Sequence, residues 1–201
     1  MNQNFKRVLP TIFTGIALLF SFINLIFLIV LKDDLYVDAW DYVTTVFVFL
    51  SIGGLLAIAI LELLNRQVPI AVYFAPLGVY ALSFLLYGFE SLININKSYS
   101  SSRYINFNSF IAYIYTIAII GLLIYAICKK KATLAAISIS YFIFDYFIAG
   151  LKAFNQIFFA IFSDNEFKYG FNNFVEYNAH LLFFVTIALI VYDYFKKNKS
   201  I

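Results

Sequence analysis

The sequence predicts an all-α fold: a polytopic membrane protein whose residues 1–201 form a single integral membrane domain, a six-transmembrane-helix bundle. Three observations predict this class. Hydrophobic residues make up 63% of the chain and charged residues only 12%, a composition outside the range of soluble domains. The apolar residues lie in six runs, each long enough to cross about 30 Å of hydrocarbon at about 1.5 Å per residue. The cationic residues gather in short clusters between the runs, which indicates membrane topology and argues against nucleic-acid binding.

The expected spans follow these apolar runs in order: residues 11–31, 43–64, 68–89, 109–128, 132–153 (with a possible amphipathic extension to 162) and 173–195. The first run is too long for the apolar part of a secretory signal peptide and has no small-residue cleavage site, so we expect an uncleaved first span. In the second, Ser51 and Gly53 give a small face that favours close helix packing. In the third, Pro69 suits the first helical turn, whereas Pro76 and Gly78 predict a kink near the middle.

The last three spans are bounded by polar and charged segments. The segments 90–108 and 163–172 are polar and are expected to be loops. A cluster of three lysines at 129–131 ends the fourth span, and the fifth begins directly after it. A second lysine cluster at 196–199 follows the sixth span. The boundaries of the last three spans are therefore predicted from these changes between apolar and polar sequence.

Lysine and arginine are distributed unevenly between the two sides of the membrane that six spans define. The side of the N-terminus carries nine cations: Lys6, Arg7, Arg66, Lys129, Lys130, Lys131, Lys196, Lys197 and Lys199. The opposite side carries four: Lys32, Lys97, Arg103 and Lys168. By the positive-inside rule, we expect a multi-pass protein of the cell membrane with its N- and C-termini in the cytoplasm.

The functional prediction centres on the fifth span, because this apolar run contains Asp145. Polar or small residues at spacings of three or four share one helical face with it: Ser138, Tyr141, Ala149, Lys152 and Asn155. A carboxylate that faces lipid costs about 2.5–3.5 kcal/mol on insertion scales. We therefore expect this face of the helix to look into the bundle or into a water-filled cavity.

Other spans contribute polar residues at a similar depth. Counted from the outer ends of their spans, Asp145 lies about 12 Å deep, and His180 and Asn24 lie about 10 Å deep. The candidate substrate-binding residues of this layer are Asp145, His180, Asn24, Tyr141, Lys152, Glu176, Tyr177 and Tyr113. A purely structural role is the alternative. Asn24 ends a stripe with Thr14, Ala17 and Ser21 that could join helices by packing and hydrogen bonds, and Lys152 could snorkel to the headgroups.

The sequence assigns no catalytic residue, although Asp145 and His180 are the candidates for acid–base chemistry. His180 is the only histidine, and Glu176 lies one helical turn before it. A metal site would have to use Glu176, His180 and Asp145. A histidine that is hydrogen-bonded to a tyrosine or a carboxylate is more common, so no metal or other cofactor is expected.

Three functions remain open at this stage, and binding or transport of a small solute in an outward-facing polar and aromatic pocket is favoured. The overall plan resembles the substrate-binding subunits of vitamin-type energy-coupling transporters, with Ala17 and Ser21 where such subunits have small residues for docking. That resemblance implies a small-molecule ligand and a membrane partner subunit, in addition to the lipid bilayer. One alternative is an intramembrane hydrolase that acts on lipid through Asp145, His180 and Glu176. The other is a non-catalytic immunity or regulatory protein.

Overall fold

The computed structural model describes residues 3–30, 39–64, 66, 68–97, 100–159 and 164–199. Within these ranges, six helices are long and apolar enough to span a membrane, which confirms the predicted all-α, six-helix bundle. The elements are α1 (Gln3–Val30), α3 (Ala39–Leu63), the short 3₁₀ helix η1 (Ile70–Tyr73), α4 (Phe74–Lys97), α5 (Ser100–Cys128), α6 (Ala132–Phe159) and α7 (Asp164–Lys199).

Most of the helices extend beyond the apolar runs that predicted them. The segments 90–108 and 163–172, expected to be loops, are helical over most of their described length, because α4 continues to Lys97, α5 begins at Ser100 and α7 begins at Asp164. Hydropathy marks only the part of a helix that lies in hydrocarbon. The backbone can keep its internal hydrogen bonds where a helix continues into polar surroundings, so the polar sequence did not indicate the helix ends.

Pro76, which predicted a kink near the middle of the third span, lies at the beginning of an α-helix. Pro69 precedes η1, and after this 3₁₀ turn the chain continues as α4 from Phe74. Pro76 is therefore the third residue of α4, where an α-helix has no internal acceptor for the backbone N–H that proline lacks. The carbonyl oxygen of Pro76 accepts a hydrogen bond of 2.7 Å from Ser51 Oγ, and this bond joins α4 to α3.

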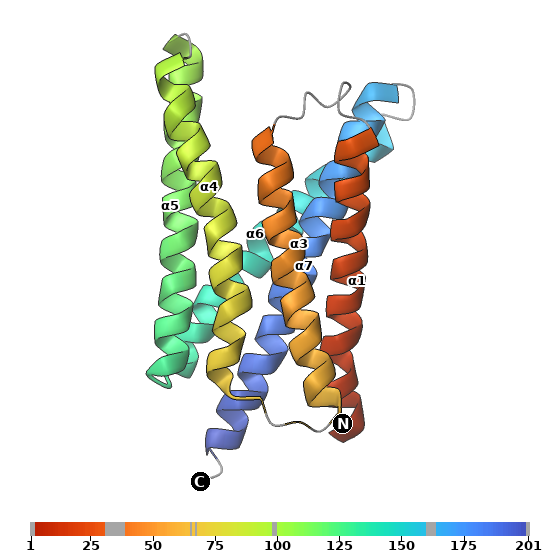
Figure 1. Ribbon diagram of the computed structural model, residues 1–201, viewed down its shortest axis with the longest axis vertical. Coiled ribbons are helices and arrows are strands. Elements are labelled where there is room, and N and C mark those ends of the chain that lie inside the picture. Colours follow the sequence, from red (N-terminus) through yellow and green to blue (C-terminus); the bar gives the residue numbers. More distant parts are fainter. Residues whose placement is uncertain are drawn as a thin grey trace.

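The helices form a ring in the order of the chain, closed by packing of α7 against α1 (Figure 1). Both chain termini lie at one end of the bundle, at the bottom of the figure. We call the half of the bundle that is farther from the termini the distal half. The connections from α3 to α4 and from α5 to α6 lie at the terminal end.

A tight turn joins α5 to α6 at the terminal end. Lys131 N donates to the carbonyl oxygen of Ala126 at 2.8 Å, and Lys130 N donates to that of Ile127 at 3.1 Å. These bonds form a Schellman motif, in which the residue after the helix adopts a left-handed conformation. Lys130 has a φ of 52°, a conformation that favours glycine.

Replacing Lys130 by glycine is therefore expected to stabilise the protein by about 1 kcal/mol, because glycine adopts this backbone conformation without steric cost. Thermal unfolding of the purified protein in detergent would measure the change. Lys129→Gly is the matched control, since Lys129 lies in the same turn without a positive φ. Equal effects of the two substitutions would contradict this explanation.

Aromatic rings contributed by α4, α6 and α7 form one cluster within a bundle interior that is otherwise mainly aliphatic. Tyr80 is fully buried, and its ring stacks on Phe183 with centroids 4.9 Å apart. Phe142 stacks on Phe184 at 4.1 Å, which packs α6 against α7. Aromatic pairs in these offset or perpendicular arrangements add to the packing energy of the contact. These rings lie beside the polar groups described below.

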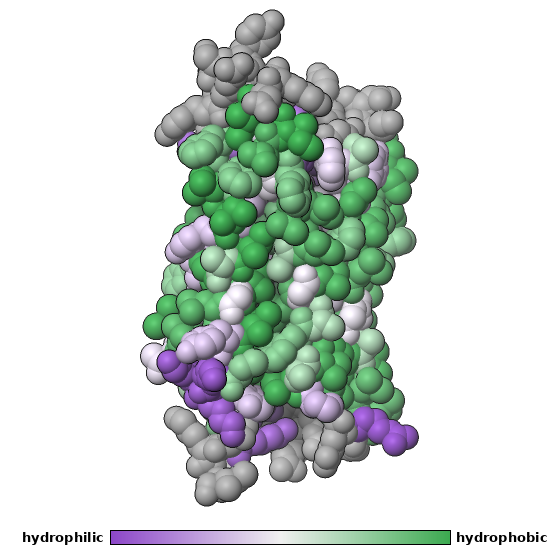
Figure 2. All heavy atoms as spheres, turned by 60° about the vertical axis from the view of Figure 1, so that its left-hand side comes forward, coloured by the Kyte–Doolittle hydropathy of each residue, from purple (hydrophilic) through white to green (hydrophobic). Residues whose placement is uncertain are grey.

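The outer surface of the described residues has the character expected of a protein in lipid. Figure 2 shows apolar residues over the middle of one face and hydrophilic residues gathered near its lower end. Within residues 8–30 of α1, the exposed side chains are all aliphatic or aromatic: Ile12, Ile16, Leu19, Phe22, Ile26, Ile29 and Val30. In water such a surface would be an extended hydrophobic patch, whereas in a bilayer it matches the surrounding hydrocarbon.

Candidate functional site

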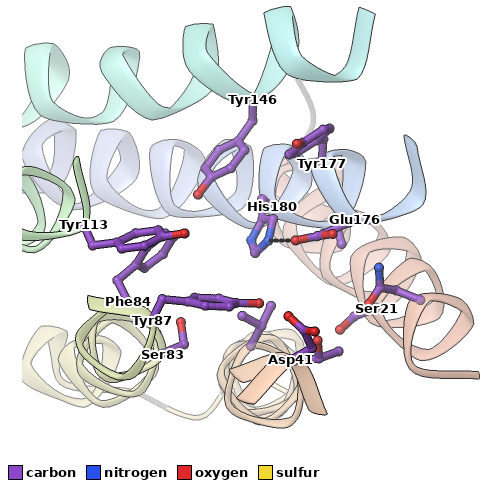
Figure 3. A pocket seen from close by; sticks show the side chains of 14 residues that line it. Ser21, Asp41, Ser83, Phe84, Tyr87, Tyr113, Tyr146, Glu176, Tyr177 and His180 are labelled. Atoms are coloured by element: carbon purple, nitrogen blue, oxygen red, sulfur yellow. Dashed lines mark ion pairs between the residues drawn. The ribbon is translucent and has the colours of Figure 1, made fainter. Parts of the chain in front are cut away.

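A cavity of about 390 Å³ lies within the ring of helices (Figure 3). All six membrane-spanning helices contribute side chains to its lining, which consists of Ser21, Asn24, Asp41, Thr45, Val48, Ser83, Phe84, Tyr87, Tyr113, Tyr146, Glu176, Tyr177, Ala179 and His180. Asp41 comes from the first turn of α3, so the cavity reaches the distal end of that helix. Its volume is typical of pockets that enclose small molecules.

A buried hydrogen-bonded chain of three side chains borders the cavity. The hydroxyl oxygens of Tyr80 and Tyr146 are 2.7 Å apart, and the Tyr80 hydroxyl oxygen is 2.8 Å from His180 Nδ1. The His180 ring also stacks on Tyr146, with centroids 4.8 Å apart. The chain therefore connects α4, α6 and α7, and it fixes the orientation of the imidazole.

On its other side, the imidazole faces a carboxylate. His180 Nε2 is 3.9 Å from Glu176 Oε1, one helical turn away on α7, and the Glu176 side chain is 38% exposed (Figure 3). This distance is too long for a hydrogen bond but allows an ion pair when His180 is protonated. One consistent assignment has Tyr146 donating to Tyr80 and Tyr80 donating to His180 Nδ1, which leaves Nε2–H on the side of Glu176.

The lining also contains a group of aromatic rings and two carboxylates. Tyr87 and Tyr113 stack with ring centroids 5.5 Å apart, and Phe84 lies 6.0 Å from Tyr113. The carboxylates of Asp41 and Glu176 belong to the lining, and no lysine or arginine is found among the described residues that line the cavity. Even with His180 protonated, the carboxylates outnumber the cations in the cavity wall.

Five of the eight residues predicted to bind substrate line the cavity: Asn24, Tyr113, Glu176, Tyr177 and His180. Asn24 also contributes to helix packing, because its Nδ2 donates to Asn172 Oδ1 of α7 at 3.4 Å. The stripe of α1 that ends at Asn24 is buried along its length, as both interpretations of it require. Asn24 therefore both lines the cavity and joins α1 to α7.

The other three predicted residues, Asp145, Tyr141 and Lys152, are exposed on α6 and do not line the cavity. The expectation that Asp145 faces the bundle interior is therefore wrong. The buried side of α6 is marked instead by Ala135, Ser138, Phe142, Tyr146, Gly150 and Ala153. This face is rotated by roughly one residue, about 100°, from the predicted one.

The reason for this rotation is the close packing of α6 on α7. A Cβ atom added at Gly150 would lie 3.5 Å from Asn178 Nδ2, so small side chains bring the two helices together. The regular spacing of small residues along α6 could have indicated this face. The polar residue Asp145 was the more conspicuous signal in the sequence, but it lies on the flank of the packed face.

Sequence reasoning did not select several residues of the cavity, among them Tyr87, Tyr146, Phe84 and Thr45. Tyrosine and phenylalanine are so frequent in this chain, at 16 and 25 residues, that their positions carried no signal. The predicted set Glu176, His180 and Asp145 is not brought together, since Asp145 lies outside the cavity. Within the described residues, no group of three or more His, Cys, Asp or Glu side chains is placed to hold a metal ion.

Comparison with protein-family models, with curated proteins and with solved structures finds no match for this chain.

Proposed function

We propose that this multi-pass membrane protein binds a small solute in the cavity, and that the solute is an organic cation. The observation that supports the proposal is the composition of the lining. Asp41 and Glu176 supply negative charge, and four tyrosines and Phe84 supply aromatic surface. Cations are attracted both by carboxylates and by the faces of aromatic rings, and aromatic cages are a common solution for quaternary ammonium groups.

The partly enclosed position of the cavity favours recognition of charge. An ion pair in surroundings of low dielectric constant is stronger than the same pair in water, but each charge must first lose its hydration. A quaternary ammonium group spreads its charge over methyl groups that can contact the rings of Tyr87, Tyr113 and Tyr146. The carboxylates then compensate the charge without requiring hydrogen-bond donors on the ligand. A neutral ligand of the same shape would lack this electrostatic attraction to the carboxylates.

Choline and its uncharged carbon isostere 3,3-dimethylbutan-1-ol are matched probes for this proposal. Trp40 is the only tryptophan and precedes Asp41 of the cavity lining, so its fluorescence can report occupancy. We expect purified protein in detergent to bind choline at least about tenfold more tightly than the isostere, a difference of about 1.4 kcal/mol. Equal affinities, or no binding of choline, would contradict the proposal. Native mass spectrometry of the freshly purified protein would identify any co-purified cation.

The proposed orientation places the distal half at the outer face of the cell membrane. The support is the positive-inside rule, because the terminal end carries Arg66, the lysines at 129–131, Lys196 and Lys197. The cavity would then receive its ligand from outside and could present it to a membrane partner subunit for transport. The immunity or regulatory alternative makes no use of the cavity, so binding of choline would count against it.

Cysteine labelling tests this orientation. In a Cys128→Ser background, Gln156→Cys near the distal end of α6 should react with a membrane-impermeant maleimide added to intact cells. Lys197→Cys, at the terminal end, should react only after the cells are permeabilised. Both side chains are exposed, so accessibility within the protein does not decide the result. The reverse labelling pattern would contradict cytoplasmic termini.

A hydrolase remains the second candidate function because the imidazole of His180 lies between Tyr80 and Glu176. This arrangement could transfer a proton to or from a lipid substrate in the cavity. It would have to act without Asp145, which lies outside the cavity. Release of fatty acid or headgroup from lipid by wild-type protein, and its loss in His180→Gln, would favour the hydrolase over the binding protein.

A further inference from the structure

In the distal half, the described part of α5 has no buried residue, although Tyr113 lines the cavity. Where the exposure of α5 residues is described, the buried ones all lie in its C-terminal half, at the end of the bundle that holds the chain termini. They are Ile119, Ile120, Leu123, Ala126 and Ile127. None of residues 105–118 is buried. Figure 1 shows the cause: α5 and α6 leave their shared turn in different directions, so that α5 rises beside α4 while α6 crosses towards the far side of the bundle.

The α5–α6 separation begins near a pair of tyrosines. The rings of Tyr115 on α5 and Tyr141 on α6 meet edge to face, with centroids 5.6 Å apart. Beyond this pair towards the distal end, the same flank of α6 carries Asp145, four residues on, and Lys152, eleven residues on, and both are exposed. On α5, Asn108 lies seven residues before Tyr115 on the same flank and is also exposed.

These polar side chains distinguish the α5–α6 flank from the outer surface of α1. All exposed residues in the range 8–30 of α1 are apolar. A carboxylate in the middle of a span is costly when it faces only hydrocarbon, and such residues generally face protein or a water-filled space. Asp145 is not covered by α5, so a hydrated gap between the two helices would account for its position.

The flank also adjoins the cavity. Tyr146, the residue after Asp145, lines the cavity from α6, and Tyr113, two residues before Tyr115, lines it from α5. α5 remains attached to α4 at this level, because a Cβ atom added at Gly88 of α4 would lie 3.8 Å from Phe110 and from Tyr113. Each edge of the α5–α6 separation thus has a polar residue outside and a cavity-lining tyrosine inside.

We propose that the separation between α5 and α6 is a lateral portal, through which a cationic amphiphile moves from the surrounding leaflet into the cavity. This proposal rests on the proposed function and adds a ligand class: molecules with an ammonium head and a hydrocarbon chain. The head passes Asp145 and reaches the carboxylates of Asp41 and Glu176, while the chain remains between α5 and α6 in contact with lipid. The exposed carboxylate of Asp145 attracts the head group at the portal.

The test compares a water-soluble cation with a membrane-bound one. Asp145→Cys and Phe144→Cys are made in a Cys128→Ser background, modified with a bulky uncharged maleimide, and reconstituted in bilayer discs of phosphatidylglycerol. Phe144 is the matched control, because it is adjacent in sequence and is 67% exposed on the outside of α6. The association rates of choline and of dodecyltrimethylammonium are followed by the fluorescence of Trp40.

Modification at position 145 should slow association of dodecyltrimethylammonium at least about tenfold and change the rate for choline less than about twofold, while modification at 144 changes neither rate. An unchanged rate for the amphiphile after modification at 145 would overturn the portal. Binding of choline but not of the amphiphile to unmodified protein would also overturn it, while leaving the proposed function intact. If neither cation binds the unmodified protein, the proposed function itself fails and the portal fails with it.

Discussion

Tyr80→Ala is expected to destabilise the protein by about 3–5 kcal/mol, the largest loss among the substitutions considered. The Tyr80 ring is fully buried and contacts the rings of Phe84, Phe183 and Phe184, with centroids 4.9–5.2 Å away. Its removal leaves a cavity among these rings and also breaks the hydrogen-bonded chain to Tyr146 and His180. Unfolding of the purified protein, followed by the fluorescence of Trp40, would measure the loss.

Tyr80→Phe separates the hydroxyl from the ring. It should cost about 1–3 kcal/mol, because the Tyr146 hydroxyl and His180 Nδ1 would lose a buried partner while the ring packing remains. The double substitution with Tyr146→Phe should cost less than the sum of the single ones, with a coupling of about 0.5–3 kcal/mol.

A hydroxyl at the surface provides the control for this comparison. Tyr192 is 62% exposed on α7, and Tyr192→Phe should change stability by less than about 0.5 kcal/mol. Two results would show that the hydrogen bonds among Tyr146, Tyr80 and His180 do not stabilise the fold as described. One is a loss of stability in Tyr80→Phe no larger than in Tyr192→Phe, and the other is additive losses for Tyr80→Phe and Tyr146→Phe.

Glu176→Gln is expected to weaken choline binding by about tenfold or more, the largest effect of a charge-neutralising change in the cavity. Glutamine keeps the size of the side chain but removes the negative charge, so affinity for 3,3-dimethylbutan-1-ol should change little. Titration of both probes against the Trp40 signal would reveal this difference. A loss that was equal for the charged and uncharged probes would indicate damage to the cavity shape instead of loss of a charge contact.

Asp193→Asn is the matched control for this charge. Asp193 also lies on α7, and 193 − 176 = 17 residues separate it from Glu176, about 26 Å along the helix axis. It is absent from the cavity lining, so choline affinity should stay at the wild-type value. If Asp193→Asn were as harmful as Glu176→Gln, the effect would come from the overall charge of the protein.

The number and approximate positions of the helices were predictable because they depend on hydropathy, which adds up along the chain. Hydropathy is summed over about twenty residues, so six spans could be recognised even in a sequence rich in phenylalanine throughout. Helix ends depend instead on single hydrogen bonds at the membrane surface, and the continuation of α7 back to Asp164 left no mark in hydropathy. The 3₁₀ turn η1, which precedes α4 in the third span, likewise left no mark in hydropathy.

The candidate site was only partly predictable, because it depends on the rotation of each helix about its own axis. Counting residues grouped His180 with Asn24, and both line the cavity. On α6 the same method selected Asp145, although the neighbouring Tyr146 is the residue that lines the cavity. Rotation is set by packing against a neighbouring helix, and information about that packing lies in the partner sequence of α7.

The ring of helices also has a consequence for biogenesis. The amide of Asn24 bonds to Asn172, which is 148 residues later in the chain. At a synthesis rate of about 5–20 residues per second, Asn24 is made about 7–30 s before this partner exists. His180 and Glu176 also belong to the last span, so the ring cannot close nor the cavity acquire its full lining before that helix leaves the ribosome. Until then, the polar groups of the first five spans lack the partners that α7 supplies.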